Sequence, residues 1–404
     1  MKRKRTKPSS NKTNEDSLNT NNNNKQSLQS KKKNNETEDL KKSNVNVQVK
    51  PSFIKTFFLY IFDWKCWLLG LIIIPLLNYA ALKYENREFK LSGEFLDFNW
   101  QQTMYISCLG KGLPTVIMDS STGMTSDIWI PAQKELSKLT QVCIYDRHGL
   151  GFSRQRLQNV NNVSDPYVIK RFGQLSTVER MVDDLHHLVT VSKPLPRPFI
   201  LVGSELGALN VRFYTQLYER DVSDIVLVYP LVENLFHQDD GIWHNYWYSD
   251  LISSVLKLQL SAFAGISRIG LLLGFMDVPI KGEHIVEDII IRQKHFLCNP
   301  HHLGAALDEH YFMNYSFSQM KTIWKLKPFP VNVSVTVING KFYDKTLQPD
   351  LNKAWEKSQH HLIGNLHNGC NHISIADADH DITFKEPWII IESVKKLILG
   401  WRRK

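Results

Sequence analysis

Residues 198–208 read Pro-Phe-Ile-Leu-Val-Gly-Ser-Glu-Leu-Gly-Ala. The first half is a short apolar, β-prone run bounded by turn-forming residues, which predicts a buried strand. Gly203 and Gly207 then bracket a tight turn, and residues 208–214 have the spacing of a buried helix. A strand, a sharp turn and a helix in this order push the side chain at the apex of the turn out above the end of a sheet. The apex here is Glu205, an acid rather than a hydroxyl residue.

Apolar strands and helices alternate on both sides of this turn. The expected elements are strands over residues 99–109, 114–119, 141–146, 224–229 and 333–339, and helices over 129–139, 176–191 and 387–399. Repeated strand–helix units with apolar strands predict an α/β fold with a mostly parallel central sheet and helices on both faces. Residues 230–325 interrupt the alternation, which predicts a helical cap inserted between two strands of a domain spanning 93–404.

The cap is rich in aromatic residues, and two interpretations of them stay open. They either line an apolar pocket or a bilayer-facing lid, or they form ordinary packing within the cap. The residues concerned are Trp243, Tyr246, Trp247 and Tyr248.

The N-terminal part of the chain differs in composition from the rest. Residues 1–52 form a Lys/Asn-rich tail too polar to fold, and residues 53–82 contain the least interrupted apolar stretch, a predicted transmembrane anchor. Of the net charge of +9, residues 1–50 contribute +8, with thirteen basic against five acidic residues. The remainder is nearly neutral, which excludes nucleic-acid binding as its main role.

A basic tail before the anchor predicts a single-pass protein with a cytosolic N-terminus and a lumenal or extracellular main domain. Three Asn-x-Ser/Thr sequons in the main domain fit this orientation and predict a glycoprotein: Asn162, Asn314 and Asn332. Placement in the cytosol through a membrane-surface hairpin is the alternative.

The cysteines and histidines lack the spacing of a metal site, so we expect no metal and no cofactor. Cys66 falls in the apolar segment, and the other four cysteines permit two disulfides whose connectivity stays open: Cys108, Cys143, Cys298 and Cys370. Cys143 lies inside an apolar strand, so we expect a buried free thiol there.

Four motifs together resemble the α/β-hydrolase fold family of the single-domain esterase/lipase type, over about residues 100–400. The first is similar to the strand and loop that supply an oxyanion donor, and the second to the family's Tyr-Asp-Arg-x-Gly-x-Gly-x-Ser segment. The third is similar to its nucleophile turn, and the fourth to the segment bearing its catalytic His. They are residues 114–123, 145–153, 201–208 and 379–387.

The resemblance implies a role for particular residues of this chain. His380 takes the place of the general base, and Asp344 that of the acid, with Asp350 as the nearest rival. The two oxyanion N–H groups are expected from Ser121 and Leu206. The order of turn, acid and His along the chain is also that of the family.

Glu205 departs from the family pattern, and three interpretations follow. Acyl transfer needs a hydroxyl at the apex, so Glu205 predicts a hydrolase-like protein with impaired catalysis. A turn shifted by one residue would instead present Ser204 as nucleophile, and in a third reading Glu205 is itself a carboxylate nucleophile. A non-catalytic domain would bind a lipid-like or acyl ligand beneath its cap, or serve as a membrane-tethered module for protein partners not yet defined.

Overall fold

The computed structural model describes residues 64–98, 102–155, 176–282, 285–366, 370–376 and 378–403. The predicted tail, the first part of the predicted anchor and the sequon at Asn162 lie outside these residues.

A nine-stranded sheet forms the centre of the domain, with strand order β1-β2-β4-β3-β6-β7-β8-β9 and β5 beside β2. The pairs from β4 through β3, β6, β7 and β8 to β9 are parallel, and only β1, β2 and β5 make antiparallel pairs. The strands are β1 (Glu94–Phe98), β2 (Gln102–Leu109), β3 (Thr115–Asp119), β4 (Val142–Tyr145), β5 (Arg154–Gln155), β6 (Phe199–Ser204), β7 (Val222–Val228), β8 (Ser334–Gly340) and β9 (Asn371–Ile375).

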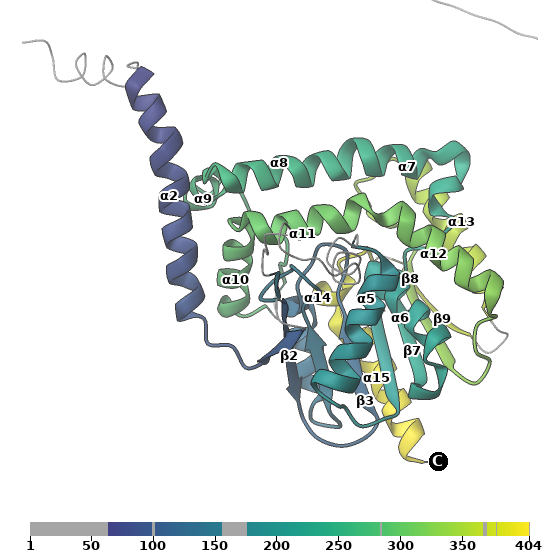
Figure 1. The fold of residues 1–404 in the computed structure, drawn as a ribbon. Helices are drawn as coiled ribbons and strands as arrows, with labels where there is room; N and C mark the ends of the chain where they lie inside the picture. The colour runs from purple at the N-terminus through teal and green to yellow at the C-terminus, as the bar shows by residue number, and fades with distance from the viewer. Residues whose placement is uncertain are drawn as a thin grey trace, which may run out of the picture. The chain divides into compact units, whose positions relative to one another are not determined.

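Every residue of β3, β4 and β6 is buried, as expected for parallel strands covered on both faces. Helices α5 and α6 pack together on one face of the sheet, and α15 lies on the other face (Figure 1). Helix α3 packs against α15. The predicted α/β class, with a mostly parallel sheet between two helical layers, is confirmed. The helices of these layers are α3 (Ile130–Leu136), α5 (Val178–His187), α6 (Leu206–Leu217) and α15 (Pro387–Arg402).

Between β7 and β8 the chain forms a run of helices. They are α7 (Ile242–Tyr246), α8 (Ile252–Phe263), α9 (Ile266–Leu272), α10 (Glu287–Leu297), α11 (Pro300–Tyr311) and α12 (Met313–Leu326). After β8 come α13 (Pro349–Asn365) and the short α14 (Ile382–Lys385). Trp243 and Trp247 are fully buried in this part, and their indole N–H groups donate to the carbonyls of Leu351 and His310. These two indoles therefore serve packing rather than a pocket wall.

Helix α2 (Trp64–Glu88) precedes the sheet. Its stretch from Leu68 to Glu88 is the one helix among the described residues that is long and apolar enough by itself to cross a membrane, and little of it is buried. The helix continues six residues beyond the predicted end of the anchor at residue 82.

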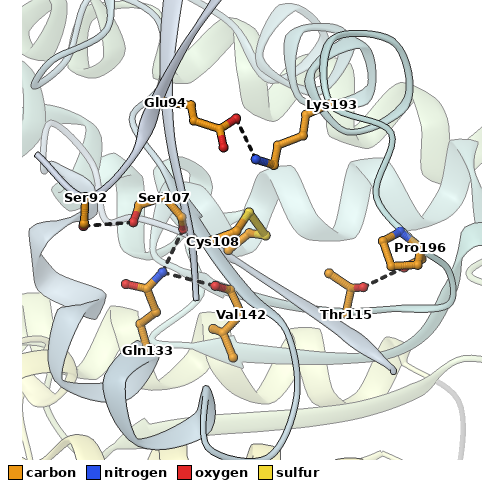
Figure 2. The surroundings of a disulfide bond; sticks show 10 residues. Ser92, Glu94, Ser107, Cys108, Thr115, Gln133, Val142, Lys193 and Pro196 are labelled. Atoms are coloured by element: carbon orange, nitrogen blue, oxygen red, sulfur yellow. Dashed lines mark hydrogen bonds and ion pairs between the residues drawn. A yellow bond between two sulfur atoms is a disulfide. The ribbon is translucent and has the colours of Figure 1, made fainter. Parts of the chain in front are cut away.

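A disulfide joins Cys108 of β2 to Cys143 of β4, so the prediction of a free thiol at Cys143 is wrong (Figure 2). The two residues face each other in the antiparallel register, with their Cα atoms 4.0 Å apart. The side-chain amide of Gln133 on α3 also joins β2 to β4 beside the disulfide, because it donates to the carbonyls of Ser107 and Val142 at 2.7 and 3.1 Å. The sequence shows both strands but not which residues oppose each other.

Replacing Cys108 and Cys143 together by Ala should lower the free energy of unfolding by about 2–4 kcal/mol, because the bond closes a long loop in the unfolded chain. Urea unfolding of the full chain in detergent measures this difference. Cys370→Ala, which removes a free thiol, is the matched control and should leave the midpoint unchanged. Equal midpoints for the double variant and the wild type would contradict the expectation.

Candidate functional site

Glu205 lies at the apex of the turn between β6 and α6, with φ 49° and ψ −108°. Gly203 and Gly207 permit this turn, because a Cβ on Gly203 would collide with the backbone of Gly207, and one on Gly207 with that of Asp119. The predicted register of the turn is therefore the one the structure has. Glu205 begins the turn out of β6, as the spacing of the glycines predicts.

Ser204 is the last residue of β6 and is fully buried. Its hydroxyl shares a hydrogen bond of 2.9 Å with the hydroxyl of Ser121. The strained position belongs to Glu205, so the shifted turn that would present Ser204 is not formed.

The carboxylate of Glu205 is itself held by two donors. The backbone N–H of Thr122 donates to Oε2 at 3.2 Å, and the hydroxyl of Tyr343 donates to Oε1 at 2.8 Å. Burial and the charge of Glu205 raise the pKa of Tyr343 well above its ordinary value, so the phenol stays protonated and donates. The N–H that faces the apex is that of Thr122, one residue after the predicted Ser121. Leu206, the other predicted donor, is the first residue of α6.

His380 lies beside this group but has a different partner from the one predicted. Its Nδ1 lies 3.1 Å from the backbone carbonyl of Tyr343, and its ring stacks on the ring of Tyr343 at 4.6 Å between centroids. Its Nε2 lies 3.5 Å from a carboxylate oxygen of Asp381. The histidine is thus oriented by a peptide carbonyl where the resemblance implies a carboxylate.

Asp344 does not bond to His380 in the described chain. Its Oδ1 accepts from the backbone N–H and the hydroxyl of Thr346, at 2.7 and 2.8 Å, and so closes its own turn. Asp350 is exposed in the first turn of α13. The charge of Asp344 nevertheless contributes to raising the pKa of His380, so its assignment as the triad acid stays a prediction. Tyr343, which the sequence-based prediction missed, contacts both Glu205 and His380.

Burial alone would lower the pKa of His380, but the carboxylates of Glu205 and Asp381 and the Tyr343 carbonyl outweigh it and raise the pKa. The carboxylates around the ring therefore act on His380 electrostatically, with Glu205 contributing the largest of these effects.

Glu205→Gln should lower the pKa of His380, because it removes the carboxylate charge that does most to raise this pKa. In the wild type the raised pKa stabilises the fold below the unfolded value of about 6.5, and this contribution fades as the pH rises through the folded-state pKa. Titration of the His380 ring protons by NMR measures the pKa, with His380→Gln to assign the signal. An unchanged pKa in Glu205→Gln would show that Glu205 does not act on the ring.

Arg147 lies beneath the loop that supplies the Thr122 N–H. Its guanidinium is paired with Asp119 at the end of β3 (2.6 Å) and with Glu309 on α11 (2.7 Å), and all three side chains are buried. It also donates to the carbonyls of Ser120 and Ser121. Glu309 accepts in addition from the N–H of Gly123 at 2.7 Å. One ion cluster therefore fixes the loop and ties α11 to the sheet.

Asp146 lies beside Arg147 in the segment of residues 145–153 and has a structural role too. Its carboxylate accepts from the N–H groups of Ser126 and Phe152 at 2.8 and 2.9 Å, and its carbonyl accepts from the Ser153 hydroxyl. Among the residues the structure describes, no group of three His, Cys, Asp or Glu side chains is placed to hold a metal ion.

No protein-family model matches the sequence, and no curated protein matches it significantly. Solved structures do match the fold. The Cif epoxide hydrolase from Acinetobacter nosocomialis has a TM-score of 0.58 and 12% identity, over 80% of this chain and 96% of that one. A probable hydrolytic enzyme from Pseudomonas aeruginosa PAO1 has a TM-score of 0.53 and 14% identity, over 76% of this chain and 95% of that one. Together with the sheet order and the turn at Glu205, these similarities show that the chain has the α/β-hydrolase fold.

Proposed function

We propose that this chain is a membrane-anchored protein of the α/β-hydrolase fold in which the hydrolytic reaction is silenced. The observation that carries the proposal is the carboxylate of Glu205 at the apex, bound by the Thr122 N–H and the Tyr343 hydroxyl. Acyl transfer needs a hydroxyl at this position and a free N–H for the oxyanion. Glu205 supplies no hydroxyl, takes up the N–H and adds a negative charge that would repel the oxyanion.

The position of Tyr343 supports the same conclusion. A nucleophile and its base must lie within hydrogen-bond reach of each other. Here the hydroxyl of Tyr343 binds Glu205 while its ring stacks on His380, and no hydrogen bond joins Glu205 to His380 in the described part of the chain. The phenol of Tyr343 thus contacts both the apex residue and the histidine, where a catalytic pair would contact each other.

A second candidate is a hydrolase in which Glu205 is a carboxylate nucleophile. The carboxylate at the apex favours it, together with the similarity of the fold to an epoxide hydrolase. Glu205 already accepts bonds on both oxygens, which lowers its nucleophilicity, so the silenced site is the better reading.

Hydrolysis of small aryl esters and aryl epoxides by the full chain separates the two candidates. We expect the wild type and Glu205→Gln to show the same background rate with both substrates, because Glu205 is not a nucleophile in a silenced site. Turnover by the wild type that disappears in Glu205→Gln would contradict the silenced site and establish the carboxylate nucleophile.

We also propose that α2 anchors the protein with its main domain in the lumen or outside the cell. The length and apolar surface of α2, the basic N-terminal tail and the disulfide between β2 and β4 support this orientation, since disulfides persist in oxidising compartments. Asn332 is exposed before β8, and Asn314 is exposed on α12.

Glycosidase treatment of the protein made in a eukaryotic cell tests the orientation. We expect the wild type to migrate faster after treatment, and a variant with Gln at Asn162, Asn314 and Asn332 to migrate alike before and after. A wild type without a shift, whose main domain is digested by protease added to the cytosolic side, would contradict the proposal.

A further inference from the structure

Helices α8 and α9 form a sharp corner whose outer surface is apolar. The two helices are bent by 90° relative to each other, and Gly265 between them has φ 72°. From residue 258 to residue 276 the sequence holds a single charged residue, Arg268. The large exposed apolar side chains of this corner are Leu256, Leu260, Phe263, Ile266, Ile269, Leu272, Leu273 and Phe275, with Leu272 79% and Phe275 85% exposed. Apolar surface of this extent on one site marks an interaction surface.

The corner packs directly against α2 (Figure 1). A Cβ on Gly265 would collide with the backbone and side chain of Ile74, so the two helices touch at that glycine. The side-chain amide of Asn78 donates to the carbonyl of Ala262 at 3.0 Å. Ile74 and Asn78 both lie within the stretch of α2 that is apolar enough to span a membrane. The corner is therefore continuous with the apolar surface of α2.

Arg268 does not interrupt this surface, because its charge is directed toward α2 and paired there. Its Nε donates to the side-chain carbonyl of Asn78 at 2.8 Å, and its Nη1 and Nη2 donate to the carboxylate of Glu85 at 2.5 and 3.1 Å. The ring of His295 on α10 also lies 2.7 Å from this carboxylate. The polar groups at the contact thus satisfy one another, and apolar side chains remain on the outside.

We infer that the α8–α9 corner inserts its apolar side chains into the lipid leaflet through which α2 leaves the membrane, as a second membrane contact of this protein. The inference rests on the proposed membrane span of α2. We choose lipid as the occupant because the corner contacts α2 within the apolar stretch. Lys83 is the first charged residue after this apolar run, and Asn78, which contacts the corner, lies five residues before it, about 8 Å along a helix. Exposed apolar side chains on a helix bind a bilayer by burying their apolar surface at the boundary between headgroups and acyl chains.

The contact also bears on the candidate site. Helix α8 packs on α11, which carries the Glu309 that pairs with Arg147 beneath the Thr122 loop. A membrane-bound α8 would hold α11, and with it this loop, at the membrane surface.

Fluorescence quenching by spin-labelled lipid tests the inference in the full chain, reconstituted in phosphatidylcholine nanodiscs. Cys66, Cys298 and Cys370 are replaced by Ala, and the disulfide is kept. An environment-sensitive NBD dye is then attached to one new cysteine at a time: Leu272→Cys on the corner, Ile72→Cys on α2, or Lys396→Cys on the exposed side of α15. Lipids with a doxyl group on the acyl chain act as quenchers.

We expect the dyes at residues 272 and 72 to emit at shorter wavelength than the dye at 396 and to lose fluorescence when the doxyl lipid is added. Quenching at 72 with a water-like, unquenched dye at 272 would overturn the inference and leave the anchor intact. A blue-shifted but unquenched dye at 272 would also overturn it, since protein would then cover the corner. Absence of quenching at both 72 and 272 would overturn the anchor and the inference together.

Discussion

A Glu205→Ser variant of the full chain should react with a fluorophosphonate that leaves the wild-type protein unlabelled. The substitution places a hydroxyl at the apex and frees the N–H of Thr122, which in the wild type binds the Glu205 carboxylate. It also removes one of the carboxylates that raise the pKa of His380. Loss of the nucleophile costs about 10⁶ in rate in a serine protease, so even partial recovery stands far above background.

Two further variants show whether the recovered reaction uses the site described. Adding His380→Ala to Glu205→Ser should abolish labelling, because the serine then has no base. Adding Tyr343→Phe should increase it, because the phenol that binds residue 205 loses its hydroxyl. An unlabelled Glu205→Ser protein that is folded would mean that more than Glu205 silences the site.

Arg147→Met should destabilise the fold by about 3–5 kcal/mol. The change leaves the buried carboxylates of Asp119 and Glu309 without their cation and removes the donors to the Ser120 and Ser121 carbonyls. The midpoint of urea unfolding of the full chain in detergent measures the loss.

The matched control is Lys138→Met, which breaks the exposed pair with Glu135 and should leave the midpoint of unfolding nearly unchanged, because water screens this pair. If Arg147→Met fails to fold, Glu309→Gln still tests the cluster, since it keeps the shape and removes one charge. Glu309→Gln with the stability of the wild type would show that the tie between α11 and the sheet is not important for folding.

The fold and the apex were predictable because their signals are local. The apolar run before Gly203 and the two glycines determine a strand and a turn within eleven residues, and Glu205 follows from their spacing. The edge strand β9 (Asn371–Ile375) was not predicted, because it is largely polar and exposed and depends on its pairing with β8.

The parts of the site that were missed depend on contacts between distant segments. Tyr343 follows β8 and stacks on a histidine 37 positions later, and nothing in its neighbourhood distinguishes it from Asp344. Glu309 meets Arg147 across 162 positions, and its helix carries no motif. Cys143 was misassigned because the register of β2 against β4, and not the apolar character of β4, decides which cysteines pair.

The measurement that tests the central claim most directly is mapping of fluorophosphonate adducts by mass spectrometry in the full-length wild type, Ser204→Ala and Glu205→Ser. The silenced site at Glu205 predicts no adduct in the wild type or in Ser204→Ala, and an adduct on residue 205 in Glu205→Ser. An adduct on Ser204 of the wild type that is absent from Ser204→Ala would contradict the account, because it would show an active serine hydrolase with a shifted turn.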